Sequence, residues 1–102
     1  MKPRLEKFIR YLTNERGLSA RTCSAYQRDL AQFAMFMSEQ GVDDSAKVHE
    51  FQVRSFIARR HRQGLGGKSL QRILSSIRGF YRWQIREGLA PVSYTHLRAH
   101  ET

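Results

Sequence analysis

Residues 68–87 read KSLQRILSSIRGFYRWQIRE, the clearest helical pattern in the chain. At about 100° per residue, the large apolar side chains gather on one side of a helix and the basic side chains on the opposite side. The apolar side is formed by Leu70, Ile73, Leu74, Ile77, Phe80, Tyr81 and Ile85, and the basic side by Lys68, Arg72, Arg78, Arg82 and Arg86. Gly88 follows as a typical helix stop. The stretch predicts an amphipathic helix, packed on one face and positively charged on the other.

Three further helical stretches precede this one. We expect them over about residues 3–16, 19–39 and 49–63, separated by joints at Gly17, at Gly41 and at residues 64–67. Ser19 is the expected N-cap of the second helix, and residues 42–47 are expected to form a loop. No segment alternates like a strand, and both prolines lie near the ends. The sequence predicts an all-α bundle of four helices.

The bulk composition narrows the class of protein. A chain of 102 residues is one small domain. Cys23 is the only cysteine, so no intrachain disulfide can form. The longest apolar run, Phe33–Met37, is far too short to span a membrane, and the N-terminus has no signal-like apolar stretch. We therefore expect a cytoplasmic protein without membrane association.

The charge is unevenly distributed. Between Glu50 and Glu87 there is no acidic residue but there are nine basic ones, which equals the net charge of +9 of the whole chain. A solvated basic helix would usually carry glutamates four residues before its cations, and this stretch has none. A local excess of positive charge favours a polyanionic partner, and nucleic acid is the leading candidate.

The second helix has an outer face of its own. Arg21, Ser24, Ala25, Arg28 and Gln32 lie opposite an apolar face formed by Cys23, Tyr26, Leu30, Phe33, Ala34 and Met37. Taken alone, the outer face is typical of a solvated surface. Beside the basic fourth helix, a second DNA-facing element is an equally good interpretation.

No catalytic or metal-binding constellation can be found. The histidines are isolated, and one cysteine cannot complete a zinc site. There is no phosphate-binding loop and no Ser/His/Asp arrangement, so we expect no cofactor and no metal. Trp83 lies at the edge of the apolar face of the fourth helix, where it could pack against another domain.

Two segments resemble a known family. Leu18–Thr22, followed by Tyr26, Asp29–Leu30 and Phe33, resembles the second helix of tyrosine recombinases of the Xer and phage-integrase type. A second segment resembles the fourth helix of that family. It consists of Gly64-Leu65, followed by Ser69-Leu70, Arg72, Leu74-Ser75, Ile77-Arg78 and Phe80–Trp83. The resemblance extends over about residues 3–90. It implies that residues 1–91 are an N-terminal core-binding, SAM-like domain, which forms half of a clamp around DNA.

The resemblance also implies site residues. In that family the second and fourth helices face the major groove, which implies DNA-facing positions for Ser24, Ala25, Arg28, Lys68 and Arg72. Arg21 is added from its place on the outer face of the second helix, and Arg78 and Arg82 are predicted from charge alone as phosphate contacts. The predicted partners are double-stranded DNA and, in the intact protein, further recombinase subunits. The chain alone is expected to be a monomer.

The family's chemistry resides in a separate C-terminal domain, whose tyrosine attacks a DNA phosphate without metal or nucleotide. This chain has no counterpart, so no catalytic residue is assigned and the chain is not expected to be an enzyme. The intact protein would cleave and rejoin DNA, in chromosome dimer resolution or in mobile-element integration. Residues 92–102 depart from the family pattern; our hypothesis is a truncated reading frame that ends in translated vector or adaptor sequence, poorly ordered.

Two alternatives remain open. A small stand-alone nucleic-acid-binding protein would bind RNA and DNA alike, whereas a recombinase domain should favour B-form duplex. A protein-interaction module would instead use Trp83, Phe51 and Met35 as interface residues.

Overall fold

The structure is a computed structural model, and it describes residues 1–90. Its elements are α1 (Lys2–Asn14), α2 (Ala20–Glu39), the short 3-10 helix η1 (Ser45–Lys47), α3 (Glu50–Arg62) and α4 (Gly67–Arg86). The prediction of an all-α bundle with four principal helices is confirmed for this part of the chain. Residues 91–102, and with them the hypothesis about the 92–102 tail, lie outside the described residues.

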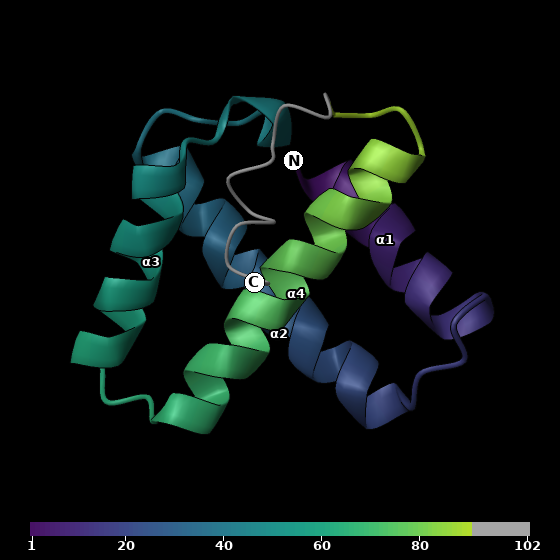
Figure 1. Ribbon diagram of the computed structural model, residues 1–102, viewed down its shortest axis with the longest axis horizontal. Coiled ribbons are helices and arrows are strands. Elements are labelled where there is room, and N and C mark those ends of the chain that lie inside the picture. The colour runs from purple at the N-terminus through teal and green to yellow at the C-terminus, as the bar shows by residue number, and fades with distance from the viewer. Residues whose placement is uncertain (91–102) are drawn as a thin grey trace.

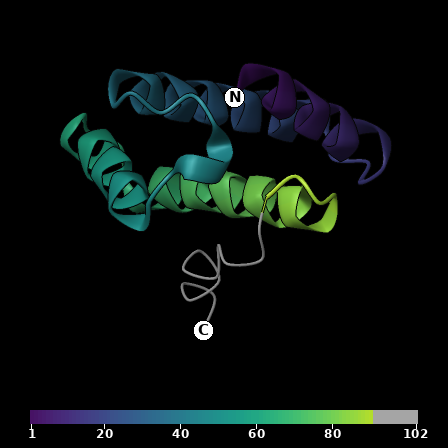
Figure 2. The same cartoon turned by 90° about the horizontal axis from the view of Figure 1, so that it is seen from above.

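The four helices form two layers. The first layer consists of α1 and α2, and the second of α3 and α4, as the view from above shows (Figure 2). Each layer is a helical hairpin of consecutive elements. In Figure 1, α4 passes in front of α2, and the two helices cross near the middle of each. This crossing brings the second and fourth helices of the sequence into contact.

The helix ends follow the local signals in the sequence. The Ser19 hydroxyl accepts a hydrogen bond from the Thr22 amide at 3.2 Å, which confirms the predicted N-cap of α2. Just after the C-terminal end of α4, Gly88 adopts a φ of 74°, a left-handed conformation that glycine accommodates most easily. The following amide, that of Leu89, then donates to the Gln84 carbonyl at 2.7 Å and closes the helix end.

The prediction that residues 42–47 form only a loop was wrong in part. Residues 45–47 form the single 3-10 turn η1. The Asp44 carboxylate accepts a hydrogen bond from the Ala46 amide at 2.9 Å and so caps the turn. An aspartate in this position offers the backbone a local partner, which favours a tight turn over an irregular loop.

Aromatic side chains join α1 to α4. The ring centroid of Phe8 lies 5.5 Å from that of Phe80 and 5.6 Å from that of Trp83. Trp83 is buried and packs within the domain. The expectation that it packs against another domain is therefore not needed to explain it, because α1 supplies the covering surface.

A buried polar network joins η1 to α4 and α1. Ser45 and Gln84 are buried, and the Ser45 hydroxyl donates to the Gln84 side-chain oxygen. The hydroxyl of Tyr81 donates to the Ser45 carbonyl. Nη1 of Arg4 lies 3.2 Å from the Ser45 hydroxyl and 3.1 Å from the Gln84 oxygen. The network satisfies the buried side-chain oxygen of Gln84, whose Nε2 has no hydrogen-bond partner within residues 1–90, and it fixes the end of α4 against the start of the chain.

Removing one donor from this network should lower stability. Tyr81→Phe leaves the buried Ser45 carbonyl without the hydroxyl that donates to it. We expect a loss of about 1–3 kcal/mol in the free energy of unfolding, measured by urea denaturation followed by circular dichroism. The matched control is Tyr11→Phe, whose hydroxyl accepts only from the exposed Arg86 at 3.0 Å. The control should change stability by less than about 0.5 kcal/mol, and equal losses in the two variants would contradict the assignment.

Candidate nucleic-acid interface

The crossing of α2 and α4 places their N-terminal halves on the same side of the molecule. In Figure 1 both halves extend downward from the crossing and diverge. Six of the predicted site residues belong to these two segments, and we call the surface that they mark the basic edge. The basic edge consists of Arg21, Ser24, Ala25 and Arg28 on α2 and of Lys68 and Arg72 on α4.

A bidentate ion pair connects the two helices of the basic edge. Nε of Arg72 donates to Oδ2 of Asp29 at 2.8 Å, and Nη2 donates to Oδ1 at 2.9 Å. Asp29 is 4% exposed, whereas the Arg72 side chain is 39% exposed. The hydrogen bond to Asp29 raises the pKa of Arg72, so the guanidinium stays charged. The pair therefore holds α4 against α2 with a charged group at the surface and its counter-ion beneath.

Sequence reasoning missed the role of Asp29. It did not include this residue in either face of the second helix and assigned it no partner. The signal was present, because an aspartate flanked by Leu30 and Phe33 on a packed helix needs a cation nearby. The partner itself, Arg72, lies 43 residues further along the chain, so periodicity alone could not identify it.

Helix geometry gives the direction of the other side chains relative to this ion pair. At about 100° per residue, Ala25 lies about 40° from Asp29 around α2, and Arg21 and Arg28 lie about 80–100° away. Ser24 lies about 140° from Asp29 on the same basis, on the flank farther from α4. On α4, Lys68 lies about 40° from Arg72. Arg21, Arg28 and Lys68 are exposed, and Ala25 is half-buried.

The basic edge has an unopposed positive charge. The segment of α2 before Asp29 contains no acidic residue, and α4 contains none at all. Within residues 1–90, no ion pair involves Arg21, Arg28 or Lys68. These three side chains therefore project an excess of positive charge into solvent beside the neutral Asp29–Arg72 pair.

The charge excess inferred from the sequence is partly compensated in three dimensions. Arg54 pairs with Glu50 at 2.7 Å, and Arg59 pairs with Glu39 at 3.1 Å. Both arginines belong to α3 and were counted in the acid-free stretch. Their partners are Glu50, which borders the acid-free stretch, and Glu39 at the end of α2. The positive field over α3 is therefore weaker than the composition of the stretch indicated.

Arg78 and Arg82 lie beyond the crossing, in the C-terminal half of α4. Arg82 is exposed and, with Arg16 and Arg86, lines a groove of about 440 Å³ between α1 and α4. Arg78 is half-buried and lies about 120° from Arg72 around the helix, on its other flank. The structure therefore does not gather all five basic residues of α4 at one place.

Gly79 contributes to packing as well as to surface shape. A Cβ atom at this position would lie 3.4 Å from Cζ of Phe8 on α1. The small size of Gly79 lets α1 approach α4 closely, whereas Ser75 is exposed on the same groove.

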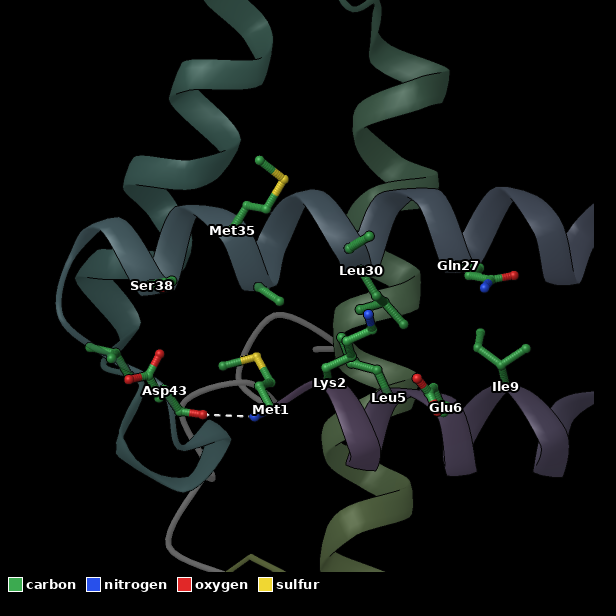
Figure 3. Close-up of a pocket in the computed structure, with 13 residues that line it drawn as sticks. Met1, Lys2, Leu5, Glu6, Ile9, Gln27, Leu30, Met35, Ser38 and Asp43 are labelled. Atoms are coloured by element: carbon green, nitrogen blue, oxygen red, sulfur yellow. Dashed lines mark hydrogen bonds between the residues drawn. The ribbon is translucent and has the colours of Figure 1, made fainter.

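A second groove lies on the opposite flank of α2. It has a volume of about 460 Å³ and runs between α1 and α2, as Figure 3 shows. Its lining is mainly apolar and includes Leu5, Ile9, Leu30, Ala34 and the exposed Met35. No residue of the basic edge lines this groove, so the two surfaces are separate.

Residues 1–90 contain neither a metal-ligand cluster nor a membrane-spanning helix. No group of three or more His, Cys, Asp or Glu side chains in that range is placed to hold a metal ion. None of the helices described is both long enough and apolar enough to cross a membrane.

Comparison with protein families matches residues 5–88 to the family described as "Phage integrase, N-terminal SAM-like domain". The chain belongs to this family. The match extends from α1 through α4 and includes the whole basic edge. The resemblance that the sequence patterns of the second and fourth helices predicted is confirmed, and so is the SAM-like fold class.

Relatives of known name are bacterial recombinases. The chain is 44% identical over 84 residues to tyrosine recombinase XerC of Xanthomonas campestris pv. campestris (strain B100), an alignment that covers 82% of this chain and 26% of the relative. It is 42% identical over 89 residues to the XerC of Pseudomonas putida (strain W619), covering 87% of this chain and 30% of the relative. No solved structure gave a significant match. The SAM-like chain thus spans less than a third of the length of these relatives.

Removal of Arg72 from the SAM-like domain should be more damaging than removal of its neighbour on the basic edge. Arg72→Ala leaves the carboxylate of Asp29 buried without a counter-ion. We expect a loss of about 1–3 kcal/mol in the free energy of unfolding, less than for a fully buried pair because Arg72 is partly exposed. Urea denaturation measures this loss. Lys68→Ala is the control and should change stability by less than about 0.5 kcal/mol; a similar small change for Arg72→Ala would show that the pair contributes nothing to folding.

Proposed function

We propose that this SAM-like domain binds duplex DNA through the basic edge, as the N-terminal clamp domain of a tyrosine recombinase. In this proposal the N-terminal halves of α2 and α4 enter or border the major groove. Arg21, Arg28 and Lys68 contact the backbone or the groove, with Ser24 and Ala25 allowing close approach. The observation that carries the proposal is the presence of exposed, unopposed cations on the N-terminal halves of two separate helices, which lie on the same side of their crossing.

Electrostatics and shape both support DNA as the polyanion. An α-helix fits the major groove of B-form DNA, and cations at its N-terminal turns meet phosphates together with the positive end of the helix dipole. Arg21 and Lys68 lie in the first turns of α2 and α4. Two diverging helix ends of this kind can follow the two strands that border a groove.

The groove between α1 and α4 supplies a second set of cations. Arg82 lines it with Arg16 and Arg86, and we propose that Arg82 contacts a phosphate away from the basic edge. Arg78, on the other flank of α4, would reach phosphate only if the duplex extends past the crossing toward that flank. These two residues are therefore proposed as outer backbone contacts and not as groove contacts.

The activity of the whole protein is proposed from its relatives. Proteins that match this chain are named tyrosine recombinase XerC. We propose that the protein to which this domain belongs cleaves and rejoins DNA together with partner recombinase subunits in the cytoplasm, and that the chemistry is provided outside the SAM-like domain. Within this division of labour, the domain itself positions DNA and performs no catalytic step.

Charge reversal at the basic edge tests DNA binding. The experiment measures fluorescence anisotropy of a labelled duplex of about 30 base pairs across a salt series, for the wild-type chain and for Arg21→Glu/Lys68→Glu. Both positions are exposed in first helical turns, where a glutamate suits the helix dipole, so the fold should be preserved. We expect affinity to fall about 10-fold or more and the log–log salt slope to decrease by about 2, because two phosphate contacts are lost.

The matched control is Lys2→Glu/Lys7→Glu on α1, which changes the net charge by the same amount away from the basic edge. Equal weakening by both double variants would mean that only net charge matters and would contradict the assignment of the site. Equal binding of duplex RNA would favour a general nucleic-acid-binding protein. No binding at low salt would refute the proposal and favour the protein-interaction alternative, in which the exposed Met35 and Phe51 are interface residues.

A further inference from the structure

Asp29 occupies only one edge of the Arg72 guanidinium. The two hydrogen bonds of the pair use Nε and Nη2, at 2.8 and 2.9 Å from the two carboxylate oxygens. The terminal edge, formed by Nη1 and the second hydrogen of Nη2, donates to no group within residues 1–90. Arg72 therefore keeps a pair of parallel N–H donors for a ligand.

The difference in burial between Asp29 and Arg72 indicates that the terminal edge of the guanidinium faces solvent. Asp29 is 4% exposed and lies beneath the guanidinium, while the Arg72 side chain is 39% exposed. The carboxylate thus approaches from the protein side. The unused donors therefore belong to the exposed part of the side chain.

The charge of the pair distinguishes Arg72 from its neighbours. Arg21, Arg28 and Lys68 have no acidic partner within residues 1–90, whereas Arg72 is neutralised by Asp29. A neutralised arginine releases few counter-ions when it meets a phosphate, so it adds little to affinity that depends on salt. A buried carboxylate beside it also makes a phosphate a poor neighbour.

Fixed geometry is what the pair provides instead. A free arginine loses much side-chain entropy when a ligand immobilises it, and the bidentate bond to Asp29 has already restricted Arg72 in the folded protein. A rigid fork of parallel donors matches O6 and N7 of guanine, which are adjacent acceptors in the major groove. A phosphate can also accept two bonds from an arginine, but a lysine can make a phosphate contact as a point charge without the planar fork.

We propose that Arg72, held by Asp29, is a specificity-determining residue that contacts the acceptor edge of a guanine in the major groove and does not serve as a phosphate contact. Asp29 is in this view a positioning residue. The inference rests on the proposed binding of duplex DNA by the basic edge, and it adds a division of labour among the residues there. Arg21, Arg28 and Lys68 provide affinity, and Arg72 provides sequence preference.

The test compares sequence preference with salt dependence. The wild-type chain and Arg72→Lys are each used to select duplexes from a randomised library, and the affinities for the selected duplex and for its single-base-pair variants are then measured by anisotropy across a salt series. Lysine keeps the charge and can still pair with Asp29, but it lacks the planar fork. We expect preference for one G·C pair to fall about 10-fold, with the salt slope unchanged.

Two further variants separate a specific role from a structural one. Lys68→Gln removes a proposed phosphate contact and should weaken binding to all duplexes equally, with the salt slope reduced by about 1. Asp29→Asn removes the counter-charge of Arg72 while keeping the side-chain shape. This variant should lose the G·C preference yet show a salt slope steeper by up to about 1, because Arg72 is then free to meet phosphate. A purely structural role for Asp29 would not steepen the slope.

The outcomes are distinct. Loss of preference at one base pair in Arg72→Lys, with salt dependence retained, supports the inference. Uniform weakening with a smaller slope would identify Arg72 as a phosphate contact, and an unchanged preference would leave it a structural residue; either result overturns the inference but leaves DNA binding by the basic edge in place. Wild-type binding to all duplexes with equal affinity would likewise overturn the inference while leaving DNA binding by the basic edge in place. Failure of the wild-type chain to bind duplex at all would instead refute the proposed function itself.

Discussion

The carboxylate of Asp29 and the guanidinium of Arg72 join α2 to α4, and the arrangement of the surface depends on that contact. Apolar attraction between crossing helices is non-directional, so on its own it leaves some freedom in their relative rotation. A bidentate bond between planar groups removes that freedom, because both hydrogen bonds weaken when either group turns. The relative position of the cations on the two helices follows from it.

Aromatic packing sets the complementary constraint on the other end of α4. Phe80 and Trp83 lie against Phe8, and Gly79 lets the helices approach closely enough for this contact. One half of α4 is thus fixed to α1 by apolar contact, and the other half is fixed to α2 by an ion pair. This division explains why the exposed part of α4 differs between its halves, with a groove along one and an open, basic surface along the other.

Those features that depend on neighbours in sequence could be predicted from the sequence. The cap at Ser19, the stop at Gly88 and the apolar stripe of α4 each arise from interactions within a few residues, and the structure has all three. Contacts between distant residues could not be predicted in the same way. Asp29 with Arg72, and Glu39 with Arg59, join helices whose relative rotation no periodicity specifies. The candidate site was therefore predicted as a set of positions, while its division into neutralised and unopposed cations required the fold.

The two-layer arrangement has a consequence for how the chain folds. Each layer is a hairpin of consecutive helices, so most of its contacts can form by closing a short loop, an event of low entropic cost. Such topologies fold quickly, commonly within microseconds to milliseconds. The bond between Arg4 and Gln84 spans 80 residues and can form only after the hairpins have docked. We therefore expect the network around Ser45 to be absent from the transition state, so that its loss accelerates unfolding and leaves the folding rate nearly unchanged.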